Sequence, residues 1–377
     1  MKCLRRRLCR CLNLISDKLG IYVHFPFCKS KCRYCDFNSS AQNWCMEDEY
    51  IYTLVREIEN CTYTDKVDTV FFGGGTPTAV KISNLIKVVE AVKTKFDVSG
   101  AEFTVECNPA TIDYEGFLML KNAGVNRISI GLQSANDDEL KFLGRIHNFD
   151  MFLKTYEDAK KAGFDNINVD LMFSLHKQNV EKWLYTLNKV IDLKPTHISA
   201  YSLIVEEGTP FYDLDLELPD EETDRKMYYD AVDLLKSKGY NHYEISNFAF
   251  DGLECKHNIK YWKRENYLGF GCGASGMYNN VRYQNTYDVS EYIKNNVVSK
   301  EVLTTEDAMA EHIFLGLRMV DGFNIEEFKA IYNVDFRKKY KEQIKKFRNL
   351  GLLEIGENCR LTKEGLSVSN SVMCEFI

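Results

Sequence analysis

Residues 20–40 read GIYVHFPFCKSKCRYCDFNSS, an apolar strand-like run followed at once by three closely spaced cysteines. Cys28, Cys32 and Cys35 have the spacing C-x3-C-x2-C and lie on a loop at the carboxyl end of the first expected strand. Barrels built of alternating strands and helices carry their chemistry on such loops. Thiolates are the ligands of iron–sulfur clusters, usually four to a cluster. Three thiolates on one loop can hold three irons and leave the fourth open.

Two other interpretations of the three cysteines stay open on the sequence alone. They could be buried core residues, but polar neighbours such as Lys29 and Lys31 argue against this. They could also bind zinc, with His24 as the fourth ligand of a closed tetrahedral site. His24 lies within the strand run, which disfavours that role. The basic neighbours are further expected to lower the pKa of the thiols.

Strand-like runs alternate with amphipathic segments of helical length between residues 21 and 205. The strand-like runs are residues 21–26, 69–72, 102–107, 127–132, 166–172 and 197–205, and the helical patterns between them are residues 47–58, 81–95, 114–123, 152–162 and 180–191. Six such repeats predict an α/β fold with a parallel sheet and right-handed crossovers, either doubly wound or curled into a partial barrel.

The regular alternation of strand-like and helical segments ends after about residue 207. A Gly-rich run occupies residues 269–276, and from about residue 304 two or three helices precede a short hairpin. We therefore predict four parts. They are a basic N-terminal extension (1–19), a core barrel (20–250), a connecting region (251–303) and a winged-helix-like C-terminal domain (304–377).

Composition and charge exclude several classes of protein. The chain has 377 residues, 45% of them hydrophobic and 27% charged, so wholesale disorder is excluded. The net charge of −7 argues against a general nucleic-acid binder, and the chain has no apolar run long enough to span a membrane. Thirteen cysteines without a secretory signal indicate a reducing, cytoplasmic location.

The first 20 residues are strongly basic, with a charge of +5 against −12 for the remainder. Leu4, Leu8, Leu12 and Ile15 could line one face of a short helix that makes peripheral contact with an anionic membrane. A solvated extension is the favoured alternative.

Residues 71–78, FFGGGTPT, end the second expected strand and form the second landmark. Glycines let backbone groups approach a ligand where a Cβ atom would clash. Together with the cysteine loop, this motif resembles radical S-adenosylmethionine (radical SAM) proteins of the oxygen-independent coproporphyrinogen III oxidase-like family. The resemblance covers roughly residues 20–377. It implies a partial (β/α)6 barrel in which Cys28, Cys32 and Cys35 hold a [4Fe-4S] cluster whose fourth iron binds S-adenosylmethionine.

The same resemblance implies a set of residues that bind S-adenosylmethionine. They lie at or near the ends of expected strands, where polar groups converge on one mouth. They are Tyr22, Gly74, Gly75, Thr76, Glu106, Gln133, Arg145 and Asp170.

Two features distinguish branches within this family. Phe37 stands where the coproporphyrinogen III oxidases carry a further cysteine, and residues 34–38, YCDFN, are similar to the HemW group of haem chaperones. Residues 257–262, HNIKYW, resemble the H-N-x-x-Y-W motif of that group. The resemblance implies that His257 contacts haem, since histidine is a common axial ligand, with Cys255 as an alternative ligand.

The function implied by the resemblance is that of a HemW-like haem chaperone. Such a protein binds a [4Fe-4S] cluster, S-adenosylmethionine and haem, and transfers haem to recipient haem proteins. An electron donor such as flavodoxin or ferredoxin would reduce the cluster. The alternative is an oxygen-independent coproporphyrinogen III oxidase of porphyrin biosynthesis, with a porphyrinogen as substrate.

Overall fold

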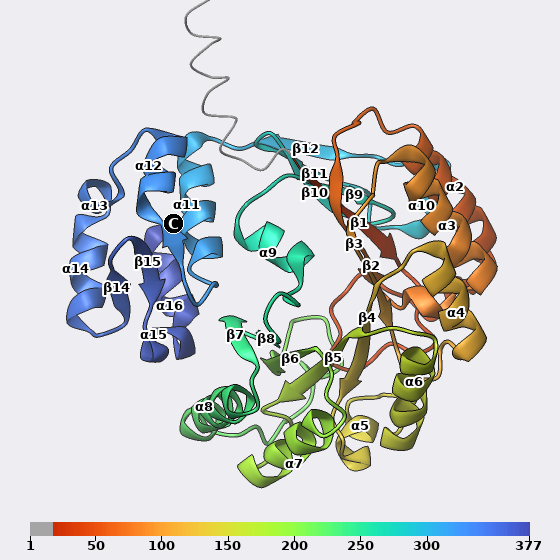
Figure 1. The fold of residues 1–377 in the computed structure, drawn as a ribbon, viewed down its shortest axis with the longest axis horizontal. Coiled ribbons are helices and arrows are strands. Elements are labelled where there is room, and N and C mark those ends of the chain that lie inside the picture. The colour runs from red at the N-terminus through yellow and green to blue at the C-terminus, as the bar shows by residue number, and fades with distance from the viewer. Residues whose placement is uncertain (1–17) are drawn as a thin grey trace, which may run out of the picture.

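A curved sheet runs through the larger part of the molecule, and the computed structural model describes residues 18–377 (Figure 1). Its central strands are parallel and lie side by side in chain order. They are β1 (Leu19–Phe25), β2 (Val67–Gly74), β3 (Glu102–Cys107), β4 (Arg127–Gln133), β5 (Asn166–Phe173) and β6 (His197–Ser202). The six strand runs expected from the sequence all form, and the predicted α/β class with a parallel sheet is confirmed.

Helices cover the outer, convex face of these strands (Figure 1). They are α2 (Glu47–Glu59), α3 (Ile82–Lys95), α4 (Tyr114–Ala123), α5 (Asp137–Phe142), α6 (Phe149–Lys161), α7 (Val180–Ile191) and α8 (Glu221–Ser237), with short 3-10 turns η2 (Asn43–Met46) and η3 (Pro77–Ala79). Capping residues begin and end several of them. Asp113 accepts a hydrogen bond from the amide of Gly116 at the start of α4, and Gly124 ends that helix with a φ of 100°.

Alternate residues of each strand face opposite sides of the sheet, and β4 illustrates the result. Ile128, Ile130 and Leu132 are fully buried in the apolar core between sheet and helices. Arg127, Ser129, Gly131 and Gln133 face the inside of the barrel instead, where they line a cavity. The barrel interior is therefore polar, unlike the packed apolar interior of a complete eight-stranded barrel.

The sheet extends at both edges beyond the expected strands. β9 (Tyr267–Phe270) pairs in parallel with β1, so β1 lies between β2 and a strand from some 250 residues later in the chain. The remaining edge strands pair antiparallel. They are β10 (Ser275–Tyr278), β11 (Val281–Gln284) and β12 (Ser299–Val302) at one edge, and β8 (Asn247–Ala249) and β7 (Asn241–Glu244) at the other.

The C-terminal domain has an apolar core of its own. It contains α11 (Thr305–Gly316), α12 (Ile325–Tyr332), α13 (Phe336–Lys339), α14 (Lys341–Asn349), α15 (Lys363–Ser367), α16 (Ser369–Met373) and the turn η4 (Cys374–Phe376). A small sheet of order β13-β15-β14 completes it, with β13 (Phe323–Asn324), β14 (Leu353–Ile355) and β15 (Asn358–Leu361). The expected helices and hairpin are thus present. The three predicted boundaries between the four parts stay a prediction.

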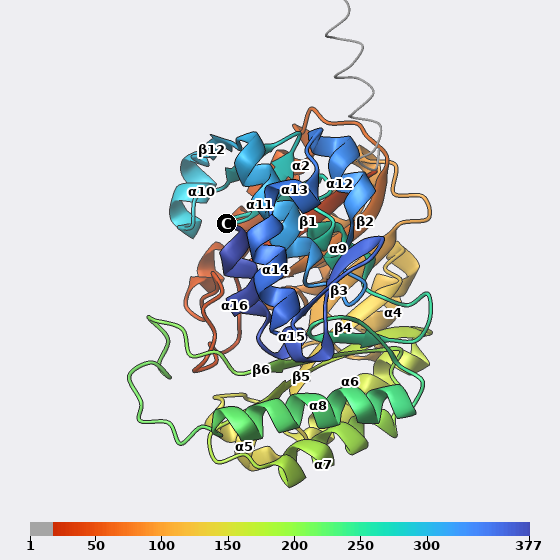
Figure 2. The same ribbon diagram turned by 90° about the vertical axis from the view of Figure 1, so that its left-hand side faces the viewer.

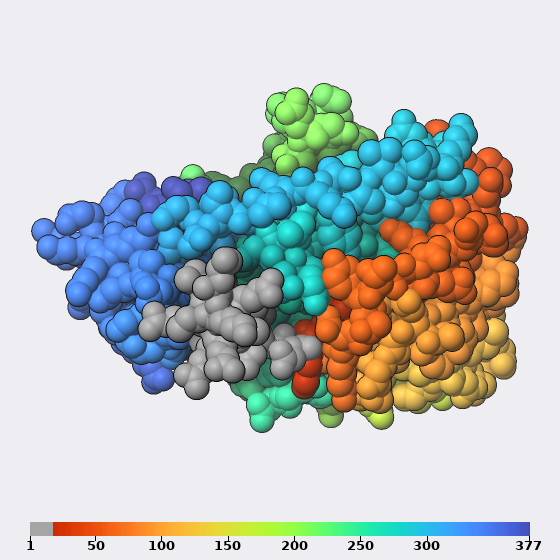
Figure 3. Space-filling view, turned by 90° about the horizontal axis from the view of Figure 1, so that it is seen from above, coloured from red at the N-terminus to blue at the C-terminus, as the bar shows by residue number. Residues whose placement is uncertain are grey.

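The C-terminal domain lies on the open side of the curved sheet, away from α2 to α6 (Figures 1 and 2). Between it and the strands lies α9 (Lys256–Trp262), while α10 (Val289–Asn295) packs beside α2. Seen from above, the segment around residues 280–305 crosses from the barrel to the C-terminal domain (Figure 3). The loop of residues 203–220 projects from the end of β6 (Figure 2).

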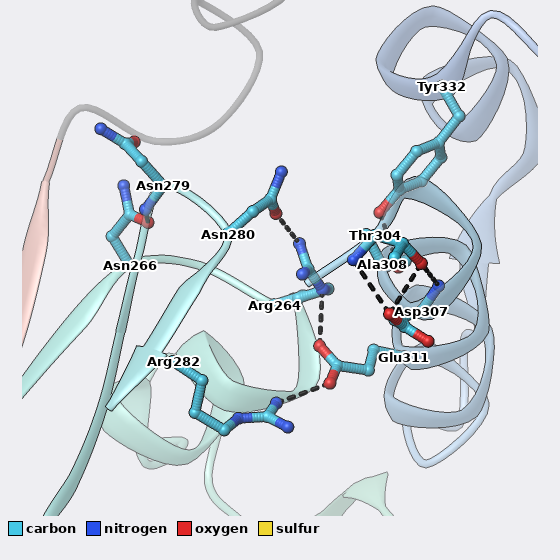
Figure 4. A network of polar contacts seen from close by, with 10 residues as sticks. All are labelled: Arg264, Asn266, Asn279, Asn280, Arg282, Thr304, Asp307, Ala308, Glu311 and Tyr332. Carbon is cyan, nitrogen blue, oxygen red and sulfur yellow. Dashed lines mark hydrogen bonds and ion pairs between the residues drawn. The ribbon is translucent and has the colours of Figure 1, made fainter. Parts of the chain in front are cut away.

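A charged cluster joins the C-terminal domain to the connecting region (Figure 4). Glu311 of α11 accepts hydrogen bonds from Arg264 at 2.9 Å and from Arg282 at 2.6 Å. Arg264 also donates to the side chain of Asn280 at 2.8 Å. The carboxylate therefore links the end of α9 and strand β11 to the first helix of the C-terminal domain.

No helix within residues 18–377 has the length and apolar character needed to cross a bilayer. The basic stretch for which membrane contact was considered, residues 1–17, lies outside the described residues.

Candidate functional site

A cavity of about 620 Å³ occupies the interior of the barrel and reaches the carboxyl ends of its strands. Ten of the residues that the sequence singles out line this one cavity. They are Cys28, Cys32, Cys35, Gly74, Gly75, Thr76, Glu106, Gln133, Arg145 and Asp170. The remaining two, Tyr22 and His257, lie outside its lining.

The cysteine loop is closed at its base by backbone hydrogen bonds. The amide of Cys28 donates to the carbonyl of Ser40 at 3.0 Å, and the amide of Ser40 donates to the carbonyl of Pro26 at 2.9 Å. The Cys28 sulfur lies 3.5 Å from the Thr76 hydroxyl oxygen, and the Cys32 sulfur accepts a hydrogen bond from Arg145 at 3.5 Å. The loop therefore holds its thiols against polar groups of the glycine loop and of the chain after β4.

The glycine loop is fastened to the strand that carries the cysteines. The amide of Gly75 donates to the carbonyl of Phe25 at 2.7 Å, and that of Thr76 donates to the carbonyl of Phe27 at 2.8 Å. A Cβ atom on Gly75 would lie 2.7 Å from both carbonyl oxygens. Gly74 has a φ of 104°, and a Cβ atom there would collide with the ring of His24. Glycine is therefore needed here for packing as well as for access to a ligand.

His24 is not positioned as a fourth ligand of a zinc site. Its Nδ1 atom lies 2.9 Å from the Tyr22 hydroxyl oxygen, and its Nε2 atom lies 2.7 Å from the carbonyl oxygen of Asn38. Within residues 18–377, no three His, Cys, Asp or Glu side chains converge on a point where one ion could bind. Ligands of a four-iron cluster bind separate irons and need no such convergence. Both ring nitrogens of His24 therefore have hydrogen-bonding partners, and a cluster held by the three cysteines would not need this side chain.

Burial dominates the electrostatics of the site. It raises the pKa of the Cys28 and Cys35 thiols, although hydrogen bonds to Cys28 from Thr76 and to Cys35 from a backbone amide act in the opposite direction. The charge of Lys31 lowers the pKa of Cys35, as expected of a basic neighbour, but desolvation is the larger effect and the net shift is upward. Burial, followed by the charge of Asp170, raises the pKa of Glu106 to about 8.

Tyr22 and His257 flank Phe71, whose ring lines the cavity. The Tyr22 ring stacks on Phe71 with centroids 6.4 Å apart, and the His257 ring does so at 5.3 Å. His257 is 1% exposed. Its Nδ1 atom lies 2.9 Å from the Thr69 hydroxyl oxygen and its Nε2 atom 2.8 Å from the Tyr261 hydroxyl oxygen. Both ring nitrogens thus have hydrogen-bonding partners, and the role of His257 toward haem stays a prediction.

Several residues that line the cavity were missed by motif reading. Asn108 donates to the Thr76 hydroxyl at 2.7 Å and accepts from Arg145 at 2.6 Å, so it bridges two residues of the predicted site. Others come from the inward faces of β4, β5 and β6. They are Arg127, Ser129, Asn168, His197, Ser199 and Tyr201. The signal that could have found them is period-two polarity within otherwise apolar strands.

The chain is similar to known proteins over nearly its whole length. Residues 22–190 match the radical SAM superfamily, and residues 303–368 match the HemN C-terminal domain. The chain is 37% identical over 366 residues to the haem chaperone HemW of Lactococcus lactis subsp. lactis, covering 94% of this chain and 96% of that protein. The chain belongs to the HemW family. The HemW of Bacillus subtilis is 36% identical over 374 residues, covering 94% of this chain and 98% of that protein.

The fold of this HemW-family chain is shared with a solved radical SAM enzyme. The coproporphyrinogen III oxidase HemN of Escherichia coli superposes with a TM-score of 0.85 over 97% of this chain and 92% of that chain, at 22% identity. That likeness is one of fold. The predicted resemblance to the coproporphyrinogen oxidase-like radical SAM family, closest to HemW, is confirmed, and membership of the superfamily implies a [4Fe-4S] cluster and S-adenosylmethionine.

Proposed function

We propose that this HemW-family chain is a haem chaperone. It holds a [4Fe-4S] cluster and S-adenosylmethionine in the barrel cavity, binds haem and transfers it to recipient haem proteins in the cytoplasm. The proposal rests on the observation that three cysteines and a glycine loop line the same cavity. This cavity occurs in a chain that matches proteins named haem chaperone over nearly its whole length.

Some side chains of the cavity bind the cluster, and others bind the nucleotide. Cys28, Cys32 and Cys35 bind three irons and leave the fourth for S-adenosylmethionine. When bound and reduced, a cluster of this kind supplies one electron to the sulfonium of that cofactor. A protein donor such as flavodoxin or ferredoxin provides the electron. Leu203, Ile204 and Glu206 of the loop after β6, and Arg318 of the C-terminal domain, border the cavity.

Polar groups at the cavity mouth hold the nucleotide. The glycine loop offers backbone groups at Gly74 and Gly75, and Arg145 offers a charged fork beside Cys32. Glu106, Gln133 and Asp170 come from three adjacent strands and face the same space. Tyr22 acts through His24 and Phe71, because it is stacked on Phe71 and lies outside the cavity lining.

Haem contacts the face of α9 that carries the HNIKYW motif. Asn258 and Cys255 line the cavity on either side of His257. Glu102 accepts hydrogen bonds from the amides of Lys256 and His257, each at 3.3 Å, and thereby holds the start of α9 against β3. For His257 to bind iron, its ring must exchange the hydroxyl of Thr69 or of Tyr261 for the metal. Without haem, His257 is thus held by hydrogen bonds to Thr69 and Tyr261.

Anaerobic reconstitution tests the cluster. Wild-type protein is expected to hold about four irons and four sulfides per chain. Replacing Cys28, Cys32 and Cys35 together by Ala is expected to remove them. Cys45→Ala is the matched control, because Cys45 is exposed and outside the cavity lining. Iron retained by the triple variant contradicts the assignment.

Haem titration of the reconstituted protein tests the chaperone function, and incubation with coproporphyrinogen III tests the alternative. Haem retention by the wild type that is lost in His257→Ala supports the proposal, whereas equal retention contradicts the role of His257. Formation of vinyl groups from coproporphyrinogen III contradicts the chaperone and identifies an oxidase.

A further inference from the structure

A guanidinium stands inside the barrel cavity without a partner. Arg127 begins β4, faces the cavity and is 1% exposed. Within residues 18–377, its buried Nε atom has no hydrogen-bond partner. A buried charge without hydrogen bonds is costly, and native structures rarely keep one without a purpose.

Two acidic side chains whose charges act on Arg127, Asp170 and Glu102, already accept hydrogen bonds from other groups. Asp170 accepts hydrogen bonds from Asn168 at 2.7 Å and from Ser129 at 3.2 Å. Glu102 accepts from the backbone amides at the start of α9. Their charges act on Arg127 through space, but they leave its planar set of donors unfilled. The donors are therefore available to an anion that enters the cavity.

The position of Arg127 separates it from the cluster end of the site. Arg127 and Gln133 are the two ends of β4, and six steps of a strand span about 20 Å. The carboxylate of S-adenosylmethionine belongs at the cluster end, where Arg145 lies beside Cys32. Arg127 is thus placed for a second ligand, and the cavity lining near the open side of the barrel includes Cys255 and Asn258 of the α9 region.

A second arginine borders the same cavity from the side of the C-terminal domain. Arg318 follows α11, and its guanidinium lies over the ring of Trp262 at 4.4 Å from the centroid. It lies 3.8 Å from Glu244, and its Nε atom has no hydrogen-bond partner among residues 18–377. The cavity is therefore bordered by one unpartnered guanidinium inside and one partly satisfied guanidinium at its edge.

We propose that Arg127 receives a carboxylate of the bound haem, namely one propionate, with Arg318 at the edge of the cavity as a second cation. This inference rests on the proposed haem chaperone function and adds to it the group by which haem is recognised. A guanidinium binds a carboxylate through two parallel hydrogen bonds, and the surrounding low dielectric strengthens them. The propionates then orient the macrocycle with one edge toward Arg127 and its face toward α9.

Haem and haem dimethyl ester distinguish this recognition from apolar binding, because the ester lacks the two charges and keeps the macrocycle. Absorbance titrations use the full-length protein. Wild type is expected to bind haem at least about tenfold more tightly than the ester. Arg127→Gln is expected to bind haem at least about threefold more weakly than wild type, with unchanged affinity for the ester, so that the preference for haem narrows. Arg282→Gln, which removes an arginine outside the cavity, is the control and is expected to keep the preference.

The outcomes separate failure of this inference from failure of the chaperone proposal. Wild type that binds haem and ester equally, or an Arg127→Gln variant that keeps the preference, overturns the inference and leaves the chaperone intact. Arg127→Gln that weakens only S-adenosylmethionine binding assigns the carboxylate to that cofactor and also overturns it. Wild type that binds neither porphyrin contradicts the chaperone itself.

A second variant covers the case in which Arg127→Gln does not fold. Arg127→Lys keeps the charge but loses the paired donors. It is expected to weaken haem binding at least about threefold without affecting the ester. An unchanged haem affinity in Arg127→Lys overturns the inference, as does equal binding of haem and ester by wild type.

Discussion

The guanidinium of Arg145 donates a hydrogen bond to the sulfur of Cys32 at 3.5 Å. The same side chain donates to Asn108 at 2.6 Å and to the backbone carbonyl of Gly131. One arginine therefore connects the cysteine loop to the end of β4 and to the residue that follows β3. It also places a fixed positive charge beside a proposed iron ligand.

Removing this charge is expected to affect both cluster and nucleotide. Arg145→Gln should lower the reduction potential of the cluster, because a cation beside the thiolate favours the reduced, more negative form. It should also weaken S-adenosylmethionine binding at least about tenfold. Potentiometric titration and equilibrium binding measure the two effects. Arg33→Gln, an exposed arginine on the same loop, is the control, and an unchanged potential in Arg145→Gln contradicts the assigned role.

A methyl group at Gly75 is expected to separate the glycine loop from the cysteine strand. Its Cβ atom would lie 2.7 Å from the carbonyl oxygens of Phe25 and Phe27, so Gly75→Ala must move one segment. We expect a loss of about 1–3 kcal/mol in the free energy of unfolding and a reduced iron content after reconstitution. Gly356→Ala is the control because nothing lies within 4 Å of the added atom. Equal iron content in both variants would count against the packing argument.

Glu311 is expected to be a main support of the C-terminal domain (Figure 4). The Arg264 and Glu311 side chains are 5% and 10% exposed, so Glu311→Gln leaves a buried arginine without its counter-charge. We expect a loss of about 3 kcal/mol in the free energy of unfolding, measured with denaturant. The surface pair of Lys339 and Glu306 gives the comparison. Glu306→Gln should cost less than about 1 kcal/mol, and similar losses in the two variants would refute the distinction.

His312 is expected to make the C-terminal domain sensitive to acid. Burial, followed by the charge of Arg264, lowers the pKa of His312 to about 4. An unfolded histidine titrates near 6.5, so between about pH 6.5 and 4 the unfolded state binds the proton and the folded state does not. Its stabilising contribution is therefore complete above pH 6.5 and falls as the pH drops, by at most about 1.4 kcal/mol per pH unit.

The variant His312→Phe isolates this contribution, because the ring packs edge-on against Phe323, Phe328 and Tyr332 and a phenyl ring can fill the same space. Wild type should lose free energy of unfolding between pH 7.5 and pH 5. The variant should lose less over the same interval, by up to about 2 kcal/mol. An identical pH dependence in the two proteins would show that another group is responsible.

Local patterns predicted the parallel strands, the cysteine loop and the glycine loop, because each depends on the spacing of residue types within one segment. Tertiary contacts explain what was missed. The edge strands β7, β8 and β10 have only three or four residues and carry no usable periodicity. The thiol pKa values depend on burial, which the basic neighbours in the sequence do not reveal. Tyr261, four residues after His257 on one helix, was predictable as its partner, but Thr69 of β2 was not.

The environment of Arg127 could likewise be predicted only in part from the sequence. Its inward face follows from the alternation in β4, but its lack of a partner depends on where Asp170 and Glu102 find theirs. Whether a donor stays unpaired depends on the positions of side chains from several strands, so the sequence of one segment cannot predict it.

The pairing of β1 with both β2 and β9 sets an order of events during synthesis on the ribosome. One edge of β1 keeps its amides and carbonyls uncovered until residue 270 has left the exit tunnel. Asn38 of the cysteine loop completes its contact with the Tyr287 carbonyl later still. The cysteine loop thus gains this support only from residues far along the chain, so we expect it to reach its final shape only after residue 287 has been made.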